Sequence, residues 1–182
     1  RCTSQFDVGY AHFGGSGSLG NTTKTTAGNR ESLAMYSQFA QVVLPPLQKQ
    51  FKMTGAPTGS DSFFFLSFLR SRMREKIDPG NWELRLGKFK LIDDSDSTSN
   101  PTVNEGGRVF NVVSGSIASG VADIKTTAAN ETGGALGLFY PDLGIIILDA
   151  EQMRARDGAN ASKLTHGQST NTFDNNPQKL FN

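Results

Sequence analysis

The segment that decides the fold is Phe63-Phe64-Phe65-Leu66-Ser67-Phe68-Leu69, an apolar run rich in aromatic residues. It continues into Arg70-Ser71-Arg72-Met73-Arg74-Glu75-Lys76-Ile77, in which basic residues occupy every second position. Aromatic enrichment favours a strand, and a short continuous apolar run is typical of a strand that is buried on both faces. We therefore expect one long strand, buried on both faces in its first half and carrying one basic face in its second half.

A tight turn is predicted next, at Asp78-Pro79-Gly80-Asn81. Proline presets one backbone dihedral angle, and glycine accepts a positive φ at the following position. The turn predicts a hairpin whose return limb places Trp82, Leu84 and Leu86 on one face. In a regular strand Phe89 and Leu91 would point to the other face, because their numbers are odd. We expect a β-bulge at Gly87, whose extra residue would return the apolar side chains to one face.

Shorter strands are predicted further along the chain, at residues 109–117, 121–124, 136–140 and 145–148. The last two are joined by Pro141-Asp142-Leu143-Gly144, a second proline-led turn.

Two short helices are also predicted. Apolar spacing after residue 31 partly matches a helix that ends near Leu44, before Pro45 and Pro46, although an extended conformation fits as well. A second helix begins at Asp149, which can cap it together with Gln152, and stops at Gly158.

The fold class that follows is mainly β, with α+β as the alternative: antiparallel strands and hairpins, one or two short helices and extended arms at both ends. We expect an extended arm with a short helix over residues 1–59, a mainly-β domain over 60–165 and a C-terminal arm over 166–182. The first 30 residues contain many Gly, Ser, Thr and Asn and too few apolar residues to form a core, which indicates an arm that partners order.

Composition argues against several classes of function. The 18 basic and 17 acidic residues leave a net charge of +1, which gives no strong field for nucleic acid or an anionic membrane. A single Cys2 cannot form an internal disulfide, and with His12 and His166 alone it cannot complete a Cys/His zinc site. No apolar run approaches the length of a membrane span, and no signal peptide is visible. We expect synthesis in the cytoplasm.

The glycine-rich run Gly15-Ser16-Gly17-Ser18-Leu19-Gly20 has the glycine spacing of a dinucleotide-binding fingerprint. A poor helix former, Asn-Thr-Thr-Lys-Thr-Thr, follows it, and Asn21 stands where a phosphate-binding loop needs lysine. A flexible glycine-serine loop is the preferred interpretation, and we expect no cofactor.

An acidic stretch resembles a calcium-binding loop. Asp94, Asp96, Thr98 and Glu105 fall at positions 1, 3, 5 and 12 of such a loop. Ser99 replaces the glycine of the sharp turn, and strands rather than helices flank the stretch. A solvated acidic loop is therefore preferred over a cation site.

The basic row at Arg70, Arg72, Arg74 and Lys76 could track a phosphate backbone, but no aromatic residues interleave with it to stack bases. We expect an interface or a solvated strand face instead. The sequence also lacks the motifs of hydrolytic enzymes. Both histidines lie in the expected arms, and nothing indicates that Glu83 and Asp142 act as a catalytic pair. We expect no enzyme.

Two segments carry a family resemblance: Arg70-Ser71-Arg72-Met73-Arg74-Glu75-Lys76-Ile77-Asp78-Pro79-Gly80-Asn81-Trp82-Glu83-Leu84 and Gly137-Leu138-Phe139-Tyr140-Pro141-Asp142-Leu143-Gly144-Ile145-Ile146-Ile147-Leu148-Asp149. They are similar to segments in virion structural proteins of marine contractile-tailed phages, including cyanophages. The similarity extends more loosely to the glycine-serine run and to Met35-Tyr36-Ser37-Gln38. It implies assembly into a tail, baseplate or neck and transfers no active-site residue.

The expected function is that of a virion structural component that packs against other virion proteins and against copies of itself in a symmetric assembly. The expected partner-binding residues are the arm anchors and part of the basic row: Phe6, Tyr10, Phe13, Arg70, Arg72, Arg74, Phe173, Leu180 and Phe181. The alternatives are a tail-fibre-type module that binds a host glycan and, further away, an enzyme that degrades cell walls.

Overall fold

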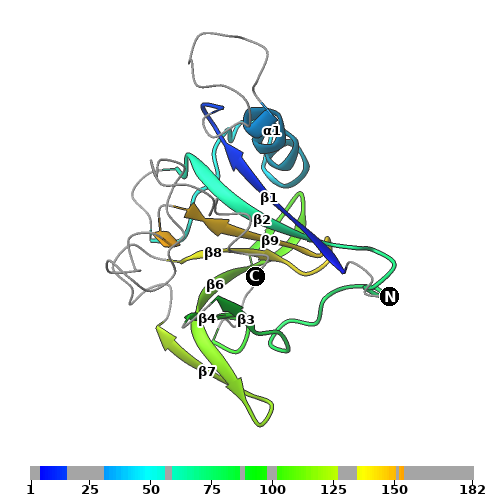
Figure 1. Cartoon of the computed structure of the whole chain (residues 1–182), viewed down its shortest axis with the longest axis vertical. Helices are drawn as coiled ribbons and strands as arrows, with labels where there is room; N and C mark the ends of the chain where they lie inside the picture. The colour runs from blue at the N-terminus through cyan, green and yellow to red at the C-terminus, as the bar shows by residue number, and fades with distance from the viewer. Residues whose placement is uncertain are drawn as a thin grey trace, which may run out of the picture.

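The protein is described by a computed structural model (Figure 1). The structure describes residues 5–15, 31–55, 59–86, 89–97, 102–126, 135–150 and 152–153. These residues form one curled antiparallel sheet and one helix, α1 (Glu31–Val43). The mainly-β fold class predicted from the sequence is confirmed. No helix in the described ranges is long and apolar enough to cross a membrane.

The sheet contains nine strands among the described residues. They are β1 (Phe6–His12), β2 (Ser62–Phe68), β3 (Leu84–Leu86), β4 (Phe89–Asp93), β5 (Thr102–Asn104), β6 (Gly107–Ala118), β7 (Val121–Thr126), β8 (Gly137–Tyr140) and β9 (Ile145–Asp149). The strand order is β1-β2-β9-β8-β6-β4-β3, and β5 and β7 both pair with β6. Strands β6 and β7 form a hairpin that extends away from α1 (Figure 1).

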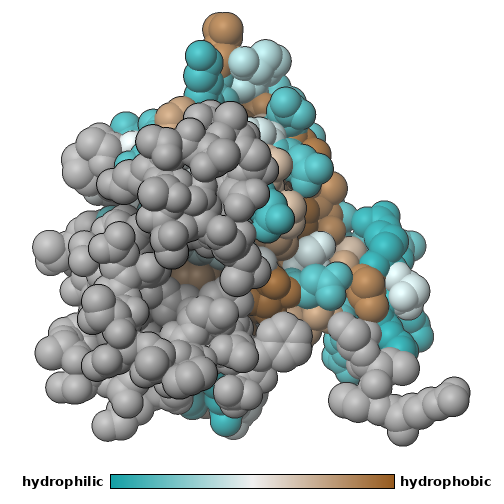
Figure 2. Space-filling model, turned by 45° about the horizontal axis from the view of Figure 1, so that its top comes forward, coloured by the Kyte–Doolittle hydropathy of each residue, from teal (hydrophilic) through white to brown (hydrophobic). Residues whose placement is uncertain are grey.

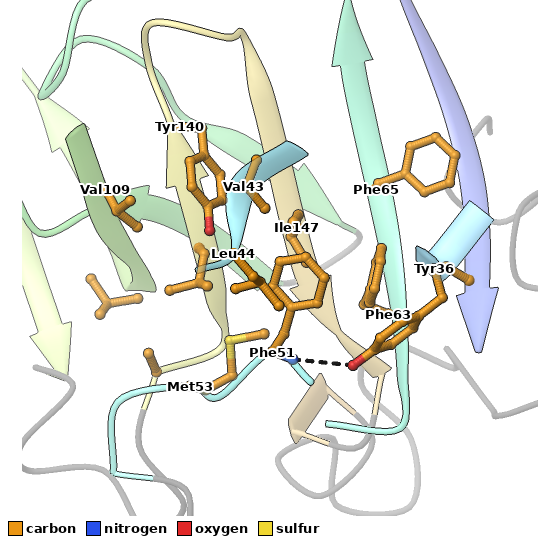
Figure 3. Close-up of a cluster of buried hydrophobic side chains, with 14 of the residues drawn as sticks. Tyr36, Val43, Leu44, Phe51, Met53, Phe63, Phe65, Val109, Tyr140 and Ile147 are labelled. Carbon is orange, nitrogen blue, oxygen red and sulfur yellow. Dashed lines mark hydrogen bonds between the residues drawn. The ribbon is translucent and has the colours of Figure 1, made fainter. Parts of the chain in front are cut away.

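Both faces of the central strands are buried, as the apolar run at Phe63 predicted. Phe63 and Phe65 point to the face that α1 covers, where they join Tyr36, Phe51 and Ile147 (Figure 3). Phe64 and Leu66 point to the opposite face, and Phe139, Ile146 and Leu148 join them there. The alternation follows from the two-residue period of a strand. Strand β2 therefore supplies both hydrophobic clusters.

Residues 6–12 lie in the sheet, where the sequence suggested an extended arm. Strand β1 pairs with β2 over its whole length, from Phe6 opposite Phe68 to His12 opposite Ser62. Ala11 is fully buried, and a side chain added to Gly9 would overlap the Phe65 ring. Helix α1 packs beside β1 (Figure 1). The described parts of residues 1–59 are thus held by the same core as the rest of the sheet, which composition alone did not indicate.

The long basic strand is a wrong prediction, because β2 ends at Phe68. Its neighbours end at the same level: β1 begins at Phe6, opposite Phe68, and β9 begins at Ile145, opposite Ser67. Within the described ranges, residues 70–76 therefore have no strand to pair with, and extended backbone without a partner is not stabilised. These residues form a loop in which alternation survives locally, since Met73 is buried between exposed Arg72 and Arg74.

The predicted turn at residues 78–81 is present, but it does not close a hairpin with β2. Strand β3 pairs with β4 instead, with Leu86 opposite Phe89. Strands β3 and β4 are thus antiparallel neighbours on either side of Gly87, and Gly87 itself, where the β-bulge was predicted, lies outside the described residues. Trp82, Leu84 and Leu86 do share a face, as predicted, and pack on the cluster around Phe139.

The remaining local predictions agree with the structure. Helix α1 ends at Val43, one residue before the predicted end. The strand pairs β6–β7 and β8–β9 form, and the second is closed by the turn at residues 141–144, in which Gly144 has φ 67°. The Asp149 carboxylate accepts a hydrogen bond from the Gln152 amide at 3.1 Å, as a helix cap would, while most of the predicted helix lies outside the described residues.

A candidate partner-binding groove

A groove of about 540 Å³ opens beside the start of β1, under the loop that follows β2. The loop is tied to three places in the sheet. Three backbone amides donate hydrogen bonds to backbone carbonyls: the Phe68 amide to Gly144 (N to O 2.9 Å), the Leu69 amide to Gln5 (3.0 Å) and the Ile77 amide to Pro141 (3.1 Å). These bonds hold the loop across the end of the sheet, so the groove is part of the folded framework.

The floor and walls of the groove are mostly apolar. The strands contribute Phe6, Leu66, Phe68, Leu84 and Ile146, and the loop adds Met73, Ile77 and Trp82. The Phe6 and Phe68 rings contact each other with centroids 5.4 Å apart, and Trp82 packs edge-on against Phe139 at 5.1 Å. A concave apolar surface of this size lies within the ~300–1,000 Å³ range of binding sites.

The rim of the groove is basic. Arg72, Arg74 and Lys76 line it, and all three residues are exposed. Among the described residues, neither Arg74 nor Lys76 is within ion-pair distance of a carboxylate. At the right of Figure 2, on the side where the loop lies in Figure 1, hydrophilic residues stand beside hydrophobic ones.

Among the described residues, Glu83 is the one acidic residue that lines the groove, and its carboxylate is paired with groups outside the groove. Its carboxylate accepts a hydrogen bond from the Ile117 amide at 2.9 Å, forms an ion pair with Arg85 and lies 3.8 Å from Lys90. The Ile117 amide and the Arg85 side chain hold the pKa of Glu83 below its usual value. The Glu83 carboxylate is therefore ionised and balanced by Arg85 and Lys90, whereas Arg74 and Lys76 at the rim form no ion pair within the described residues.

Asp93 positions the Trp82 wall of the groove. Its two carboxylate oxygens accept hydrogen bonds from the Gly80 amide at 3.0 and 2.9 Å, and Gly80 has φ 79°. Asp93 is buried, and burial raises the pKa of its carboxyl despite the hydrogen bonds from the Gly80 amide. Sequence reasoning missed this residue, although a carboxylate that directly follows Leu91 and Ile92 was a signal for a buried polar contact.

The turn between β8 and β9 supports the other end of the loop. Arg70 donates to the Asp142 carbonyl at 3.0 Å, and the Asp142 carboxylate pairs with Arg108 at 2.9 Å. The Arg108 hydrogen bond holds the pKa of Asp142 below its usual value. Arg70 is thus occupied in holding the loop, whereas Arg72 and Arg74 reach the rim of the groove.

The structure brings three of the expected partner-binding residues together: Phe6, Arg72 and Arg74 all line the groove. Tyr10 packs on Phe64 at 5.4 Å and Phe13 on Tyr36 at 5.5 Å, so both are anchored on their own domain. The other expected anchors, Phe173, Leu180 and Phe181, lie outside the described residues, as does His166.

The candidate ligand motifs do not converge in the described part of the chain. Asp94 accepts hydrogen bonds from the amide and the side chain of Asn111 at 2.9 and 2.8 Å, so both of its oxygens hold the β4–β6 connection. No three Cys, His, Asp or Glu residues are placed to hold a metal ion within the described ranges. Thr98 and most of the glycine-serine run at residues 15–20 lie outside them.

Comparisons with known proteins add no assignment: no family model matches the chain, and no match was found among curated proteins or among solved structures.

Proposed function

We propose that this protein is a non-enzymatic structural component of a tailed-phage virion, in the tail, baseplate or neck, and that it acts through packing against other subunits. The observation that carries the proposal is the placement of the two segments that resemble phage virion proteins. They are separated by more than 50 residues in the sequence, yet they pack against each other in the fold.

Several contacts join the two segments. The Arg70 guanidinium donates to the Asp142 carbonyl, the Ile77 amide donates to the Pro141 carbonyl, and the Trp82 ring meets the Phe139 ring. The first segment and Ile146 of the second line a groove with β1 and β2, and this groove has an apolar floor and exposed basic residues. Apolar surface that a polar rim surrounds is typical of protein interaction sites, which supports a role in assembly.

The test is a cryo-EM map of purified phage particles that carry this chain, together with mass spectrometry of the same particles after a high-salt wash. We expect a fixed number of copies per particle, related by the symmetry of the tail or neck, with the loop of residues 69–83 against a neighbouring subunit. Particles that assemble without the chain, or lose it in the wash, would contradict a structural role.

A host glycan-binding module is the second candidate, because Trp82 lines a concave site beside charged groups. The Trp82 ring packs on Phe139 and its Nε1 is buried, which favours a wall of the groove over an open stacking platform. A glycan array with the isolated protein separates the two candidates: specific binding that Trp82→Ala abolishes would favour the glycan module.

A further inference from the structure

We propose that the groove receives an extended segment of a neighbouring polypeptide that carries a large apolar side chain next to one or more carboxylates. The inference deepens the proposed assembly function and rests on it for the source of the segment. It follows from the chemistry of the groove in three steps.

The first step concerns the floor. Phe6, Leu66, Phe68 and Ile146 come from three adjacent strands of the sheet, and Met73 and Ile77 close over them from the loop. Burying one large apolar side chain in such a site contributes about 1.5–3 kcal/mol. The floor therefore favours an apolar anchor in the occupant.

The second step concerns charge. Of the exposed cations that line the groove, Arg74 and Lys76 form no ion pair among the described residues, and the one described acid in its lining, Glu83, is balanced by Arg85 and Lys90. Electrostatic complementarity then calls for carboxylates beside the apolar anchor. Arginine suits this role because its planar guanidinium binds a carboxylate through two parallel hydrogen bonds.

The third step concerns the class of occupant. A nucleic acid would require free aromatic faces to stack its bases, but the rings of Phe6 and Phe68 contact each other and Trp82 contacts Phe139. The cations gather at one site in a chain with a net charge of +1 rather than forming the broad basic face that a phosphate backbone needs. A peptide supplies both an apolar side chain and carboxylates within a few residues.

The experiment uses the full chain and a fluorescein-labelled synthetic peptide, Gly-Ser-Asp-Phe-Asp-Ser-Gly, with binding measured by fluorescence anisotropy. Two control peptides replace both Asp residues by Asn or the Phe by Ala. Trp82 is the only tryptophan and lies in the groove wall, so its fluorescence reports binding at this site. We expect the parent peptide to bind about tenfold more tightly than either control and to weaken as salt rises.

Protein variants locate the site. Arg74→Glu and, as a second variant, Lys76→Glu reverse exposed rim charges and should each reduce affinity about tenfold. Lys52→Glu is the matched control, because Lys52 is also exposed and lies outside the groove. It should bind as the native protein does. Circular dichroism checks that each variant is folded.

The outcomes are distinct. Equal binding of the Asn peptide, or equal effects of Arg74→Glu and Lys52→Glu, would overturn the proposal. Tighter binding of single-stranded DNA, phosphatidylserine vesicles or an oligosaccharide to the same groove would overturn it in favour of that ligand. A particle map with this chain in place and the groove open to solvent would remove the inference and leave the structural role. If the chain binds the peptide but is missing from the particles, the groove proposal would stand and the structural role would be removed.

Discussion

At the residue scale, two buried tyrosines in the same cluster differ in how their hydroxyl groups are paired. The Tyr36 hydroxyl donates to the Ser60 carbonyl at 2.7 Å and accepts from the Phe51 amide at 3.1 Å (Figure 3). The Tyr140 hydroxyl is also buried, but its contact with Asn104 falls short of hydrogen-bond geometry, and it has no other partner among the described residues. One hydroxyl therefore joins two chain segments, and the other does not.

Tyr36→Phe should destabilise the protein by about 1–3 kcal/mol, because it leaves a buried amide and a buried carbonyl without a partner. Tyr140→Phe is the matched control and should change the free energy of unfolding little, since no good hydrogen bond is lost. Urea denaturation of both variants measures the difference. Equal losses would show that the Tyr36 bonds do not stabilise the fold.

The same residues predict a response to alkaline pH. Burial raises the pKa of Tyr36 and of Tyr140 from 10.0 to about 12. Between pH 10 and 12 the unfolded state releases the tyrosine protons while the folded state keeps them. The contribution of each tyrosine to the free energy of unfolding is therefore complete below pH 10 and is lost as the pH rises towards 12.

The stability advantage of the native protein over Tyr36→Phe should therefore be constant below pH 10 and shrink between pH 10 and 12. Tyr140→Phe should become more stable than the native protein over the same window, by up to about 3 kcal/mol. Denaturation curves at a series of pH values check both trends. A difference that stays constant up to pH 12 would contradict the assigned direction of the pKa shifts.

At the scale of elements, two turns with positive φ differ in their surroundings. Gly144, between β8 and β9, has φ 67°, and a methyl group added there would overlap the Met73 side chain in the groove. Gly120, between β6 and β7, has φ 77° and open space around it. Both positions favour glycine because of their positive φ, and at Gly144 an added methyl group would also have to displace the end of the Met73 side chain.

Gly120→Ala should cost about 1–2 kcal/mol for the left-handed backbone alone. Gly144→Ala should cost about 1 kcal/mol more, at the low end for overpacking, because the added methyl group displaces the flexible end of the Met73 side chain. Chemical denaturation gives both values, and Trp82 fluorescence should shift in the folded Gly144→Ala variant only. Equal losses would mean that the loop moves away from the turn without resistance.

The elements also show where pattern reading succeeds. The turns at residues 78–81 and 141–144 were predictable because proline and glycine act on the local backbone. The loop at residues 70–76 was not, although its alternation of Arg72, Met73 and Arg74 matched a strand. An alternating pattern indicates which side chains are buried, but a strand also needs hydrogen-bonded neighbours. Both strands that pair with β2 end at the level where β2 ends.

At the scale of the whole molecule, β2 connects segments that are distant in the sequence. It pairs with β1 near the start of the chain and with β9 some 80 residues further on, and it contributes to both hydrophobic clusters. A sheet whose two faces share the same strands should unfold cooperatively.

We therefore expect one unfolding transition, with the same midpoint for far-ultraviolet circular dichroism and for the fluorescence of Trp82. Phe6→Ala, which opens the contact between β1 and Phe68, should shift both midpoints together. An earlier, separate transition by circular dichroism would indicate that β1 and α1 unfold as an independent arm, as the composition of residues 1–59 had suggested.

The sequence by itself determined the mainly-β class, the burial of Phe63–Leu66 on both faces, the helix that ends before Pro45 and the two proline-led turns. Each of these depends on neighbouring residues and on the period of the backbone. The tertiary structure alone decided that residues 6–12 complete the sheet and that Asp93 holds the turn at Gly80. It also decided that Phe6, Arg72, Arg74 and Trp82 meet around one groove. Those contacts join segments far apart in the chain, and no local pattern encodes which distant strand will supply the partner.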